Sequence, residues 1–394
     1  MLGWEYPPFI SGGLGVHCLE LTVRLAKMGH KIDFFMPTCT HPLKSPHENI
    51  RLIEVAPTTL RPYFSTSKKG QLATYGEDLI RAVDAYAKMV VEFVEEEHKK
   101  NPYDLIHAHD WLTSKGAILC KKKLSIPLVQ TVHSTEFDRT SSPWDLILEI
   151  EKPMVVEPDS IIAVSRLTGE QIKKLGADEK KIHVVYNGVD ASKYKHGGIH
   201  SFSRSIEGKK KVLFLGRLTE QKGPVQFLHS AKKVLDKNPN VVFLIAGKGS
   251  MLPLLINLTI GLGISNNVKF LGFLSEDEQR KIYSACDVYV MPSTSEPFGI
   301  VVLEAMASGT PVIISKTSGV SEVVSSALKV DFWDINGMAQ KILAVLNYSP
   351  LANSMKHMAE HDVEKLTWEK CAQETCGVYE QAVRKWAQVK SGVV

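Results

Sequence analysis

Short apolar runs alternate with longer amphipathic segments along the whole chain. Apolar runs of this length, bounded by turn residues, are typical of strands buried on both faces, and intervening helices favour parallel sheets. The pattern predicts a long helix over residues 77–98 and strands over residues 31–36, 51–55, 104–107, 127–132, 160–164, 183–186, 211–215, 241–246, 268–271, 287–291 and 311–315. We therefore expect an α/β fold with two doubly wound, Rossmann-like domains.

The strand–helix rhythm stops over residues 191–210, where glycines and serines occur without periodicity. Such a stretch is typical of a linker, and 394 residues suit two domains of about 200 residues each. Ligands of doubly wound sheets bind at the carboxyl ends of the strands, so we expect the reaction site in a cleft between the domains. The expected boundaries are 1–195 for the first domain, 196–210 for the linker, 211–366 for the second domain and 367–394 for a final helix.

The composition, 44% hydrophobic and 23% charged, is that of a soluble globular protein. No apolar run is long enough to span a bilayer and no signal peptide is evident, so a cytoplasmic location is expected. The six cysteines lack metal-ligand spacing and are expected to be reduced packing residues. The formal charge of +4 comes without interleaved aromatic and basic residues, so nucleic acid is not an expected partner, whereas an anionic membrane surface stays open.

The first domain begins with the end of an expected strand, and we expect further apolar residues upstream of Met1. Gly12-Gly13-Leu14-Gly15 then leads into a helix. Glycines at a helix N-terminus allow the backbone to approach an anion, so Gly12 and Gly13 are candidate phosphate contacts. The spacing is tighter than G-x-G-x-x-G and no acid follows at the required distance, so a hydride-transfer enzyme is not expected.

Two basic residues and two carboxylates follow strand ends of the second domain. Arg217 and Lys222 come after the strand 211–215, and Glu296 and Glu304 come after the strand 287–291. An arginine fork and a lysine point charge can hold a diphosphate, while the carboxylates can accept sugar or ribose hydroxyls. The plainer interpretation is a set of solvated charges at a domain edge.

The segment between the two carboxylates leads from a loop into a helix. The first amides of a helix, expected at Gly299, Ile300 and Val301, can bind a phosphate through the backbone. Gly247, in a turn after the strand 241–246, is a candidate contact for the nucleotide.

Histidines follow two strands of the first domain. His109 ends one strand and is a candidate substrate contact, whereas His107 lies deeper and is expected to be a satisfied core histidine. Asp110 is expected to orient a neighbour or cap the next helix. His133 and Asp138 follow the strand 127–132 and are candidates for the acceptor side. Ordinary polar loop residues are the alternative for each of these.

No Asp-x-Asp, His-Glu-x-x-His or paired-cysteine motif occurs in the sequence. A transferase that depends on a divalent cation usually needs clustered carboxylates. We therefore expect no metal and no cofactor, with the basic residues and helix amides neutralising the diphosphate instead.

Taken together, these motifs resemble those of the retaining GT-B glycosyltransferases, the superfamily that includes glycogen synthases and sucrose synthases. Within it, the chain is similar to glycosyltransferase family four. The resemblance covers nearly the whole chain and implies an N-terminal acceptor domain, a C-terminal nucleotide-sugar domain and a final helix that crosses back to the first domain. It implies that Arg217 and Lys222 hold the diphosphate, that Glu304 holds the ribose and that Glu296 contacts the transferred sugar.

The resemblance further implies that Phe298 to Val301 contact the sugar and phosphates, that His109 contacts the sugar 6-hydroxyl and that Gly13 packs against the diphosphate. Retention in this family is explained by front-face attack, with the departing phosphate oxygen taking the acceptor proton. The expected reaction is hexosyl transfer from a nucleoside diphosphate sugar to a hydroxyl acceptor, with a glucan or another sugar favoured.

Two alternatives share these features: a GT-B sugar-nucleotide epimerase and a non-catalytic sugar-nucleotide binder. At one position the chain differs from part of the family, and this bears on the donor. Glycogen synthases that use ADP-glucose carry lysine two residues before the paired glycines, where this chain has Ile10. Glycogen synthesis from ADP-glucose is therefore not expected. The donor base, the hexose, the acceptor and the oligomeric state stay open.

Overall fold

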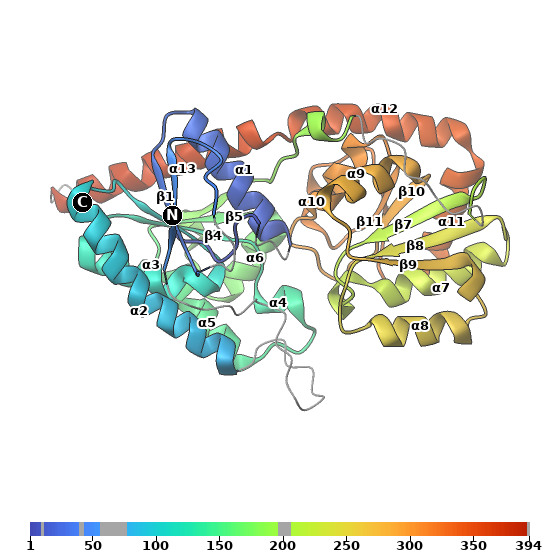
Figure 1. Ribbon diagram of the computed structural model, residues 1–394, viewed down its shortest axis with the longest axis horizontal. Coiled ribbons are helices and arrows are strands. Elements are labelled where there is room, and N and C mark those ends of the chain that lie inside the picture. The colour runs from blue at the N-terminus through green and yellow to red at the C-terminus, as the bar shows by residue number, and fades with distance from the viewer. Residues whose placement is uncertain (9–11, 39–42, 56–76, 196–205, 392–394) are drawn as a thin grey trace. The chain divides into compact units, whose positions relative to one another are not determined.

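The computed structural model describes residues 1–8, 12–38, 43–55, 77–195 and 206–391, which form an α/β fold (Figure 1). The chain divides into two compact units: residues 1–137, 142–186 and 368–394 form unit 1, and residues 138–141 and 187–367 form unit 2. The division after Tyr186 lies earlier than the expected boundary at residue 195. One reason is that the Val189 amide donates to the carbonyl of Leu366, 2.9 Å away in unit 2. The expected linker residues 196–205 lie outside the described residues.

Unit 1 is built on parallel strands. Its strands are β1 (Ile32–Met36), β2 (Ile50–Glu54), β3 (Ile106–His109), β4 (Leu128–Val132), β5 (Ser160–Ala163) and β6 (Ile182–Val184). β1 pairs with β2, and β3 to β6 pair in sequence order. Leu2 forms parallel bridges with Phe35 on β1 and Ala108 on β3, so it lies between these two strands.

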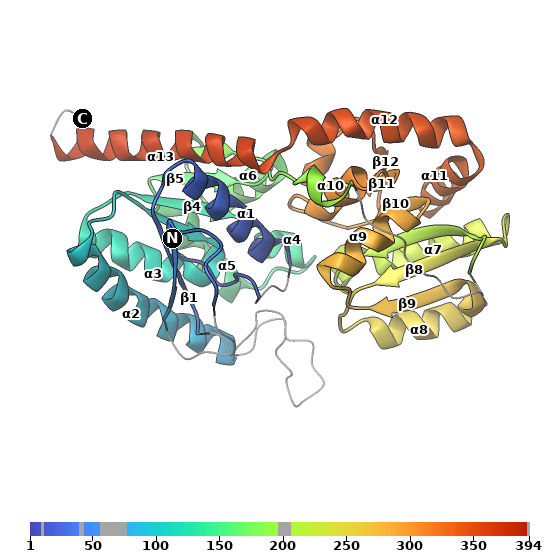
Figure 2. The same ribbon diagram turned by 45° about the horizontal axis from the view of Figure 1, so that its top comes forward.

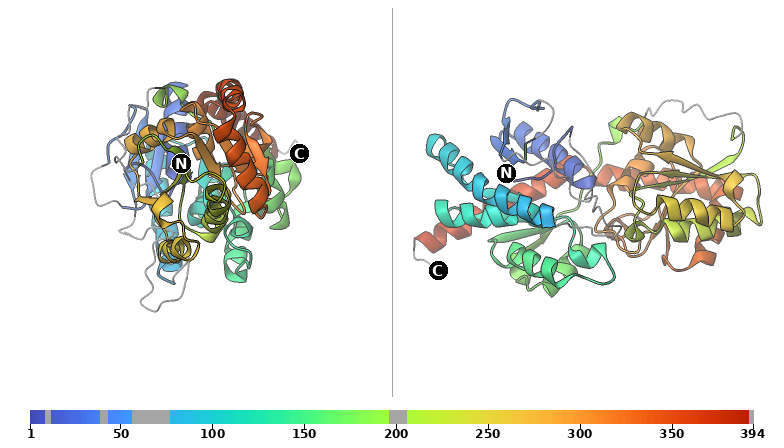
Figure 3. Two further views of the ribbon diagram at one scale, coloured as in Figure 1. Left: turned by 90° about the vertical axis from the view of Figure 1, so that its right-hand side faces the viewer. Right: turned by 60° about the horizontal axis from the view of Figure 1, so that its bottom comes forward.

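Helices cover both faces of this sheet (Figures 1 and 2). They are α1 (Gly13–Lys27), α2 (Glu77–Lys100), α3 (Asp110–Leu124), α4 (Glu136–Arg139), α5 (Asp145–Val156), α6 (Arg166–Lys174), the short η1 (Glu179–Lys181) and α13 (Trp368–Lys390). α2, α3 and α5 lie on one face, and α1 and α13 lie side by side on the other (Figure 3). Arg24 on α1 donates to Glu369 on α13 at 3.0 Å. The last helix therefore belongs to the unit that the beginning of the chain forms.

Unit 2 contains one parallel sheet with the order β12-β11-β10-β7-β8-β9. These strands are β7 (Lys210–Leu215), β8 (Val241–Ala246), β9 (Val268–Gly272), β10 (Val288–Met291), β11 (Val312–Ser315) and β12 (Leu328–Val330). Its helices are η2 (Ala191–Lys193), η3 (Glu220–Lys222), α7 (Pro224–Leu235), α8 (Leu252–Gly261), η4 (Ser265–Asn267), α9 (Glu276–Ala285), α10 (Ile300–Ala307), η5 (Gly319–Glu322), α11 (Ile335–Asn347) and α12 (Ser349–Lys365).

Each unit reverses its strand order at one place. In unit 2 the chain runs from β7 outward to β8 and β9, and then returns to place β10 on the other side of β7. In unit 1 the reversal lies at Leu2, which has β1 on one side and β3 on the other. Ligands of doubly wound sheets bind at the carboxyl ends of the strands at such switch points. The fold therefore points to the loops after β7 and β10 and those after Leu2 and β3.

Among the described residues, no helix combines the length and the apolar character that crossing a bilayer requires. The cysteines that the structure describes are all buried free thiols, which confirms their expected packing role: Cys18, Cys120, Cys286, Cys371 and Cys376. Cys39 lies outside the described residues.

Candidate active site

The two predicted cations of unit 2 follow β7 at the switch point. Arg217 lies two residues after the end of β7, and Lys222 is the last residue of η3. Gly223 follows with φ at 70°, and a Cβ atom there would lie 2.0 Å from the carbonyl oxygen of Pro292. This close backbone approach, which requires glycine, holds Lys222 beside the end of β10.

Glu296 lies in the loop after β10 and pairs with Lys222. Lys222 Nζ donates to Glu296 Oε2 at 2.7 Å, and the two side chains are 17% and 10% exposed. The loop backbone is fixed, because the Glu296 amide donates to Thr317 at 3.0 Å and the Glu296 carbonyl accepts from Gly319 at 2.8 Å. The structure thus brings together a cation and a carboxylate that the sequence places after different strands.

Helix α10 begins at Ile300, directly after Gly299, whose φ is 107°. A Cβ atom on Gly299 would lie 3.2 Å from Glu296 Cγ, so a side chain here would press on the carboxylate. Ile300 and Val301 open the helix, and their amides have no acceptor within it. These amides and the positive end of the helix dipole favour an anion. Phe298 is buried, and its carbonyl accepts from the Val320 amide at 2.8 Å.

Glu304 lies one turn into α10 and is buried. The hydroxyl of Tyr283, on α9, donates to Glu304 Oε2 at 3.1 Å, and Tyr194 provides a second hydrogen bond. Burial raises the pKa of the Glu304 carboxyl, while the two tyrosine hydrogen bonds act in the opposite direction. The carboxylate is therefore held in one orientation by phenol groups, in a position to accept further hydroxyl donors.

Close backbone packing explains why residue 247 is a glycine. Its φ is 135°, and a Cβ atom there would lie 1.8 Å from the carbonyl oxygen of Gly216. Its amide donates to Gly272 at 2.7 Å and is therefore already used. A contact between Gly247 and a nucleotide stays a prediction, and it would have to use other atoms of this residue.

In unit 1 the first turn of α1 follows the switch point at Leu2. Gly12 precedes the helix with an extended φ of 178°, and Gly13 is its first residue. A Cβ atom on Gly12 would meet no atom of the described residues within 4 Å. Gly12 thus leaves room for a ligand at a helix N-terminus, where an anion is favoured.

The histidines of unit 1 lie at neighbouring strand ends. His109 ends β3 and His133 follows β4, and His109 Nδ1 lies 3.2 Å from His133 Nε2 in a hydrogen bond. Both ring nitrogens of His107 have partners, the Tyr379 hydroxyl at 2.6 Å and the Thr131 hydroxyl at 2.7 Å. The prediction that His107 is a satisfied core histidine is confirmed.

Burial lowers the pKa of His107, His109 and His133 well below the ordinary value for histidine. Loss of hydration disfavours the imidazolium form, and repulsion between neighbouring imidazoliums adds to this effect. The three rings are therefore neutral at physiological pH.

The two aspartates predicted near this site have different neighbours. Asp110 opens α3 with φ at 57°, and its carboxylate accepts from the His133 amide at 2.6 Å. It therefore orients a neighbouring residue, as expected. Asp138 belongs to the segment that clusters with unit 2, where it accepts from the Ser295 hydroxyl at 3.0 Å. The two acceptor-side candidates, His133 and Asp138, thus fall in different units.

Sequence reasoning missed two residues of these sites. Tyr283 belongs to no recognisable sequence motif. It reaches Glu304 because α9 packs against α10. His17 lies on α1, with ring centroids 4.5 Å from His133 and 5.5 Å from His109. The available signal was its place one turn after Gly13, on a helix that begins at a switch point.

Comparison with known proteins shows the family of this chain. Residues 11–193 match the family model "Glycosyltransferase Family 4", and residues 199–362 match "Glycosyl transferases group 1". An uncharacterized glycosyltransferase of Methanocaldococcus jannaschii is 32% identical over 97% of this chain and 98% of the relative. The chain belongs to the glycosyltransferases. A glycogen synthase of Mycobacterium tuberculosis is 29% identical to this glycosyltransferase, over 98% of the chain and 94% of the relative.

Solved structures show that this glycosyltransferase has the GT-B fold. Sucrose-phosphate synthase from Thermosynechococcus elongatus matches with a TM-score of 0.75 at 21% identity, over 96% of this chain and 95% of that chain. Anabaena HepE, solved with UDP and glucose, matches with a TM-score of 0.71 at 19% identity, over 96% of this chain and 99% of that chain. The expected fold is therefore confirmed.

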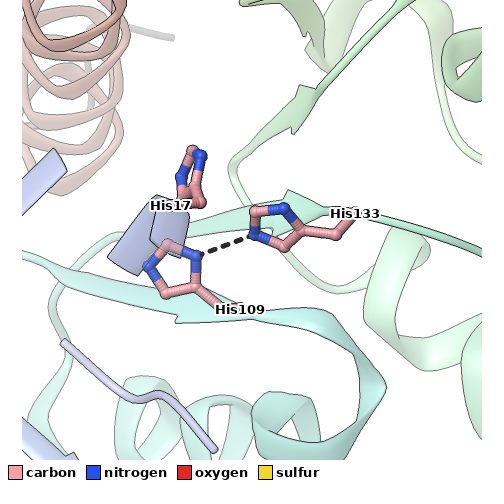
Figure 4. A group of neighbouring side chains, drawn as sticks. All are labelled: His17, His109 and His133. Carbon is pink, nitrogen blue, oxygen red and sulfur yellow. Dashed lines mark hydrogen bonds between the residues drawn. The ribbon is translucent and has the colours of Figure 1, made fainter. Parts of the chain in front are cut away.

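Within this glycosyltransferase, one group of described side chains has the donor atoms and the spacing that could hold a metal ion. His17, His109 and His133 each offer a ligand atom, and these atoms lie within 4.8 Å of one another (Figure 4). The group belongs to unit 1, whereas Arg217, Lys222, Glu296 and Glu304 belong to unit 2. The histidine group thus shares its unit with the predicted phosphate contacts Gly12 and Gly13.

Proposed function

We propose that this glycosyltransferase moves a hexosyl group from a nucleoside diphosphate sugar to a hydroxyl acceptor, retaining the anomeric configuration and using no metal ion. The observation that carries the proposal is the Lys222–Glu296 pair at the unit 2 switch point, 2.7 Å apart. A nucleotide sugar carries an anionic diphosphate next to a sugar with hydroxyl groups. The Lys222 cation suits the diphosphate, and the adjacent Glu296 carboxylate suits the sugar hydroxyls.

The proposed reaction breaks the bond between the anomeric carbon and the β-phosphate oxygen. The electron pair stays on that oxygen, and its charge is stabilised by Arg217, Lys222 and the first amides of α10. Each charge-assisted hydrogen bond contributes about 1.5–3 kcal/mol, and the part that grows as charge develops lowers the barrier. The acceptor oxygen bonds to the anomeric carbon on the same face, and its proton passes to the departing phosphate oxygen.

Glu304 is proposed to bind the ribose of the donor. Its carboxylate is held by Tyr283 at 3.1 Å and retains lone pairs for two vicinal hydroxyls. The contacts of His109 with the sugar 6-hydroxyl and of Gly13 with the diphosphate are proposed on the family resemblance.

A glucan or another sugar is the proposed acceptor. The similarity to a glycogen synthase and to HepE, which was solved with UDP and glucose, supports a glucosyl or related hexosyl donor. Ile10, in place of the lysine of ADP-glucose-dependent glycogen synthases, favours a donor other than ADP-glucose.

A donor panel tests the proposal. The protein is incubated with UDP-, ADP- and GDP-hexoses and a set of sugar acceptors, and released nucleoside diphosphate is measured. We expect nucleoside diphosphate to be released only when an acceptor is present and from donors with one of the three bases. Proton NMR of the product should show the same anomeric configuration as the donor. An inverted product would overturn retention. Conversion of the donor without an acceptor would identify an epimerase, and calorimetric binding without any release would identify a sugar-nucleotide binder.

A further inference from the structure

Three histidines from three different elements of unit 1 converge on one point. His17 projects from α1, His109 from the end of β3 and His133 from the loop after β4 (Figure 4). The ring centroids are 4.5–5.5 Å apart, and one potential ligand atom from each ring lies within 4.8 Å of the other two. Such convergence has no evident packing purpose, because aliphatic side chains would fill the same space without burying polar nitrogens.

The spacing of the nitrogens suits a tetrahedral metal ion. With zinc–nitrogen bonds of about 2.0–2.1 Å, two ligand nitrogens of a tetrahedron lie about 3.3–3.4 Å apart. His109 Nδ1 and His133 Nε2 are 3.2 Å apart. Two ligands are thus already at the required separation, and the ligand atom of His17 lies within 4.8 Å of both.

The environment of the cluster also suits a metal. His109 faces His133 through Nδ1, whereas its buried Nε2 has no hydrogen-bond partner among the described residues. His17 and His109 are buried while His133 is partly exposed, so His133 provides the side from which an ion enters.

The neighbouring groups fix the ligands in place. The Asp110 carboxylate holds the His133 backbone amide at 2.6 Å. His107 packs against His109 with ring centroids 4.3 Å apart, and both of its own nitrogens have partners, so it supports the cluster without being a ligand. Supporting contacts of this kind are typical around metal-binding histidines.

We propose that His17, His109 and His133 bind a divalent transition-metal ion of the zinc type, and that this ion inhibits the enzyme. Three imidazoles without a carboxylate favour zinc and its d-block neighbours over magnesium or calcium. The bound ion occupies His109, which is the proposed contact for the transferred sugar. The inhibitory consequence therefore rests on the proposed function, whereas binding of the ion does not.

Titration of the metal-free protein with Co²⁺, without any sugar nucleotide, tests the binding. We expect one equivalent to bind with the visible absorption of tetrahedral Co²⁺, and Zn²⁺ to displace it. Because loss of a supporting contact alone costs about 10–100-fold in metal affinity, His17→Gln and His133→Asn should each weaken binding by at least about 100-fold. Two variants are used so that a folding defect in one of them leaves the test decisive.

The matched control is a second histidine pair on the exposed face of α12. His357 and His361 have ring centroids 5.3 Å apart and could bind metal adventitiously. The variant H357Q/H361Q should retain the tetrahedral signal. Loss of the signal in that variant, or its retention in both His17→Gln and His133→Asn, would overturn the site.

Transfer assays with added Zn²⁺ test the second half of the proposal. We expect Zn²⁺ to inhibit the wild type and to require at least about 100-fold higher concentration with His17→Gln, in line with the weakened site. Tight tetrahedral binding with undiminished turnover would contradict inhibition while leaving the metal site intact. Absence of transfer under all conditions would contradict the proposed function and would not affect the Co²⁺ result.

Discussion

In the proposed mechanism, Lys222 and Glu296 bind the nucleotide sugar, and in the free enzyme they bind each other. Both side chains are largely shielded from water, so each charge depends on the other for compensation. A donor with a diphosphate and sugar hydroxyls can replace the pairing with one partner for each residue. Removing one member leaves the other partly buried and unpaired, so effects on stability must be measured beside effects on turnover.

Gly12 tests the proposed approach of an anion to α1. We predict that Gly12→Ala weakens donor binding at least about 10-fold, the equivalent of about 1.4 kcal/mol, because the methyl group occupies the space that the diphosphate would use. The fold should tolerate the change, since φ is 178° and the added Cβ meets no atom within 4 Å in the part of the chain that the structure describes. Calorimetry measures the donor affinity, and the melting temperature shows whether the fold tolerates the change. An unchanged donor affinity would show that Gly12 does not contact the donor.

Gly223 tests the turn that positions Lys222. We predict that Gly223→Ala destabilises unit 2 by more than about 2 kcal/mol, because the Cβ would meet the Pro292 carbonyl oxygen at 2.0 Å and φ is 70°. Gly261→Ala is the matched control, since a Cβ there meets nothing within 4 Å. Chemical denaturation measures both variants. Equal stability of the two would show that the turn tolerates a side chain.

Among the elements, α13 links the end of the chain to the sheet of unit 1. Tyr379 on this helix bonds to His107 on β3 at 2.6 Å, and both residues are buried. Trp368, at the start of the helix, packs its ring 5.7 Å from the ring of His17. The helix therefore supports the strand and the helix that carry the histidine cluster.

Replacing the Tyr379 hydroxyl tests this support. Tyr379→Phe leaves a ring nitrogen of His107 buried without its partner, which costs about 1–3 kcal/mol. For a unit of this size we expect a fall of about 2–10 °C in the melting temperature. Tyr348→Phe, at a tyrosine that is 61% exposed, should change it by less than about 2 °C. Equal melting temperatures for the two variants would show that the Tyr379 hydrogen bond contributes little.

The elements themselves were largely predictable, because apolar periodicity and strand-end motifs are local signals. The strands around Arg217 and Glu296 and the start of α10 lie within one or two residues of expectation. Partnerships between elements were not predictable. Tyr283 meets Glu304 through the packing of α9 on α10, and His17 meets His133 because Leu2 places α1 beside β3 and β4. Such contacts depend on tertiary packing, which a single sequence does not encode in any local pattern.

For the whole molecule, the histidines predict how stability depends on pH. Burial lowers the pKa of His107, His109 and His133 in the folded state, whereas unfolded histidine titrates near about 6.5. Below that pH the unfolded chain binds more protons than the folded one, so stability falls as the pH falls. Each histidine contributes a slope of about 1.4 kcal/mol per pH unit in that window and nothing above it.

We therefore expect the melting temperature to be nearly constant above about pH 7 and to fall on acidification below about pH 6.5. His133→Asn, which removes one of the three groups, should make the fall less steep. Calorimetric scans across this pH range provide the measurement. A melting temperature that rises on acidification would contradict neutral, buried histidines.

The central claim is that fixed cationic side chains and helix amides, without a metal ion, absorb the charge of the leaving diphosphate. The most direct test is kcat for hexosyl transfer in excess chelator, for the wild type and for Lys222→Ala. We predict that the wild type keeps its turnover and that Lys222→Ala, if folded, loses about 10²–10³-fold, as for removal of one transition-state donor. Loss of wild-type activity that added divalent cation restores, or an unchanged kcat in Lys222→Ala, would contradict the account.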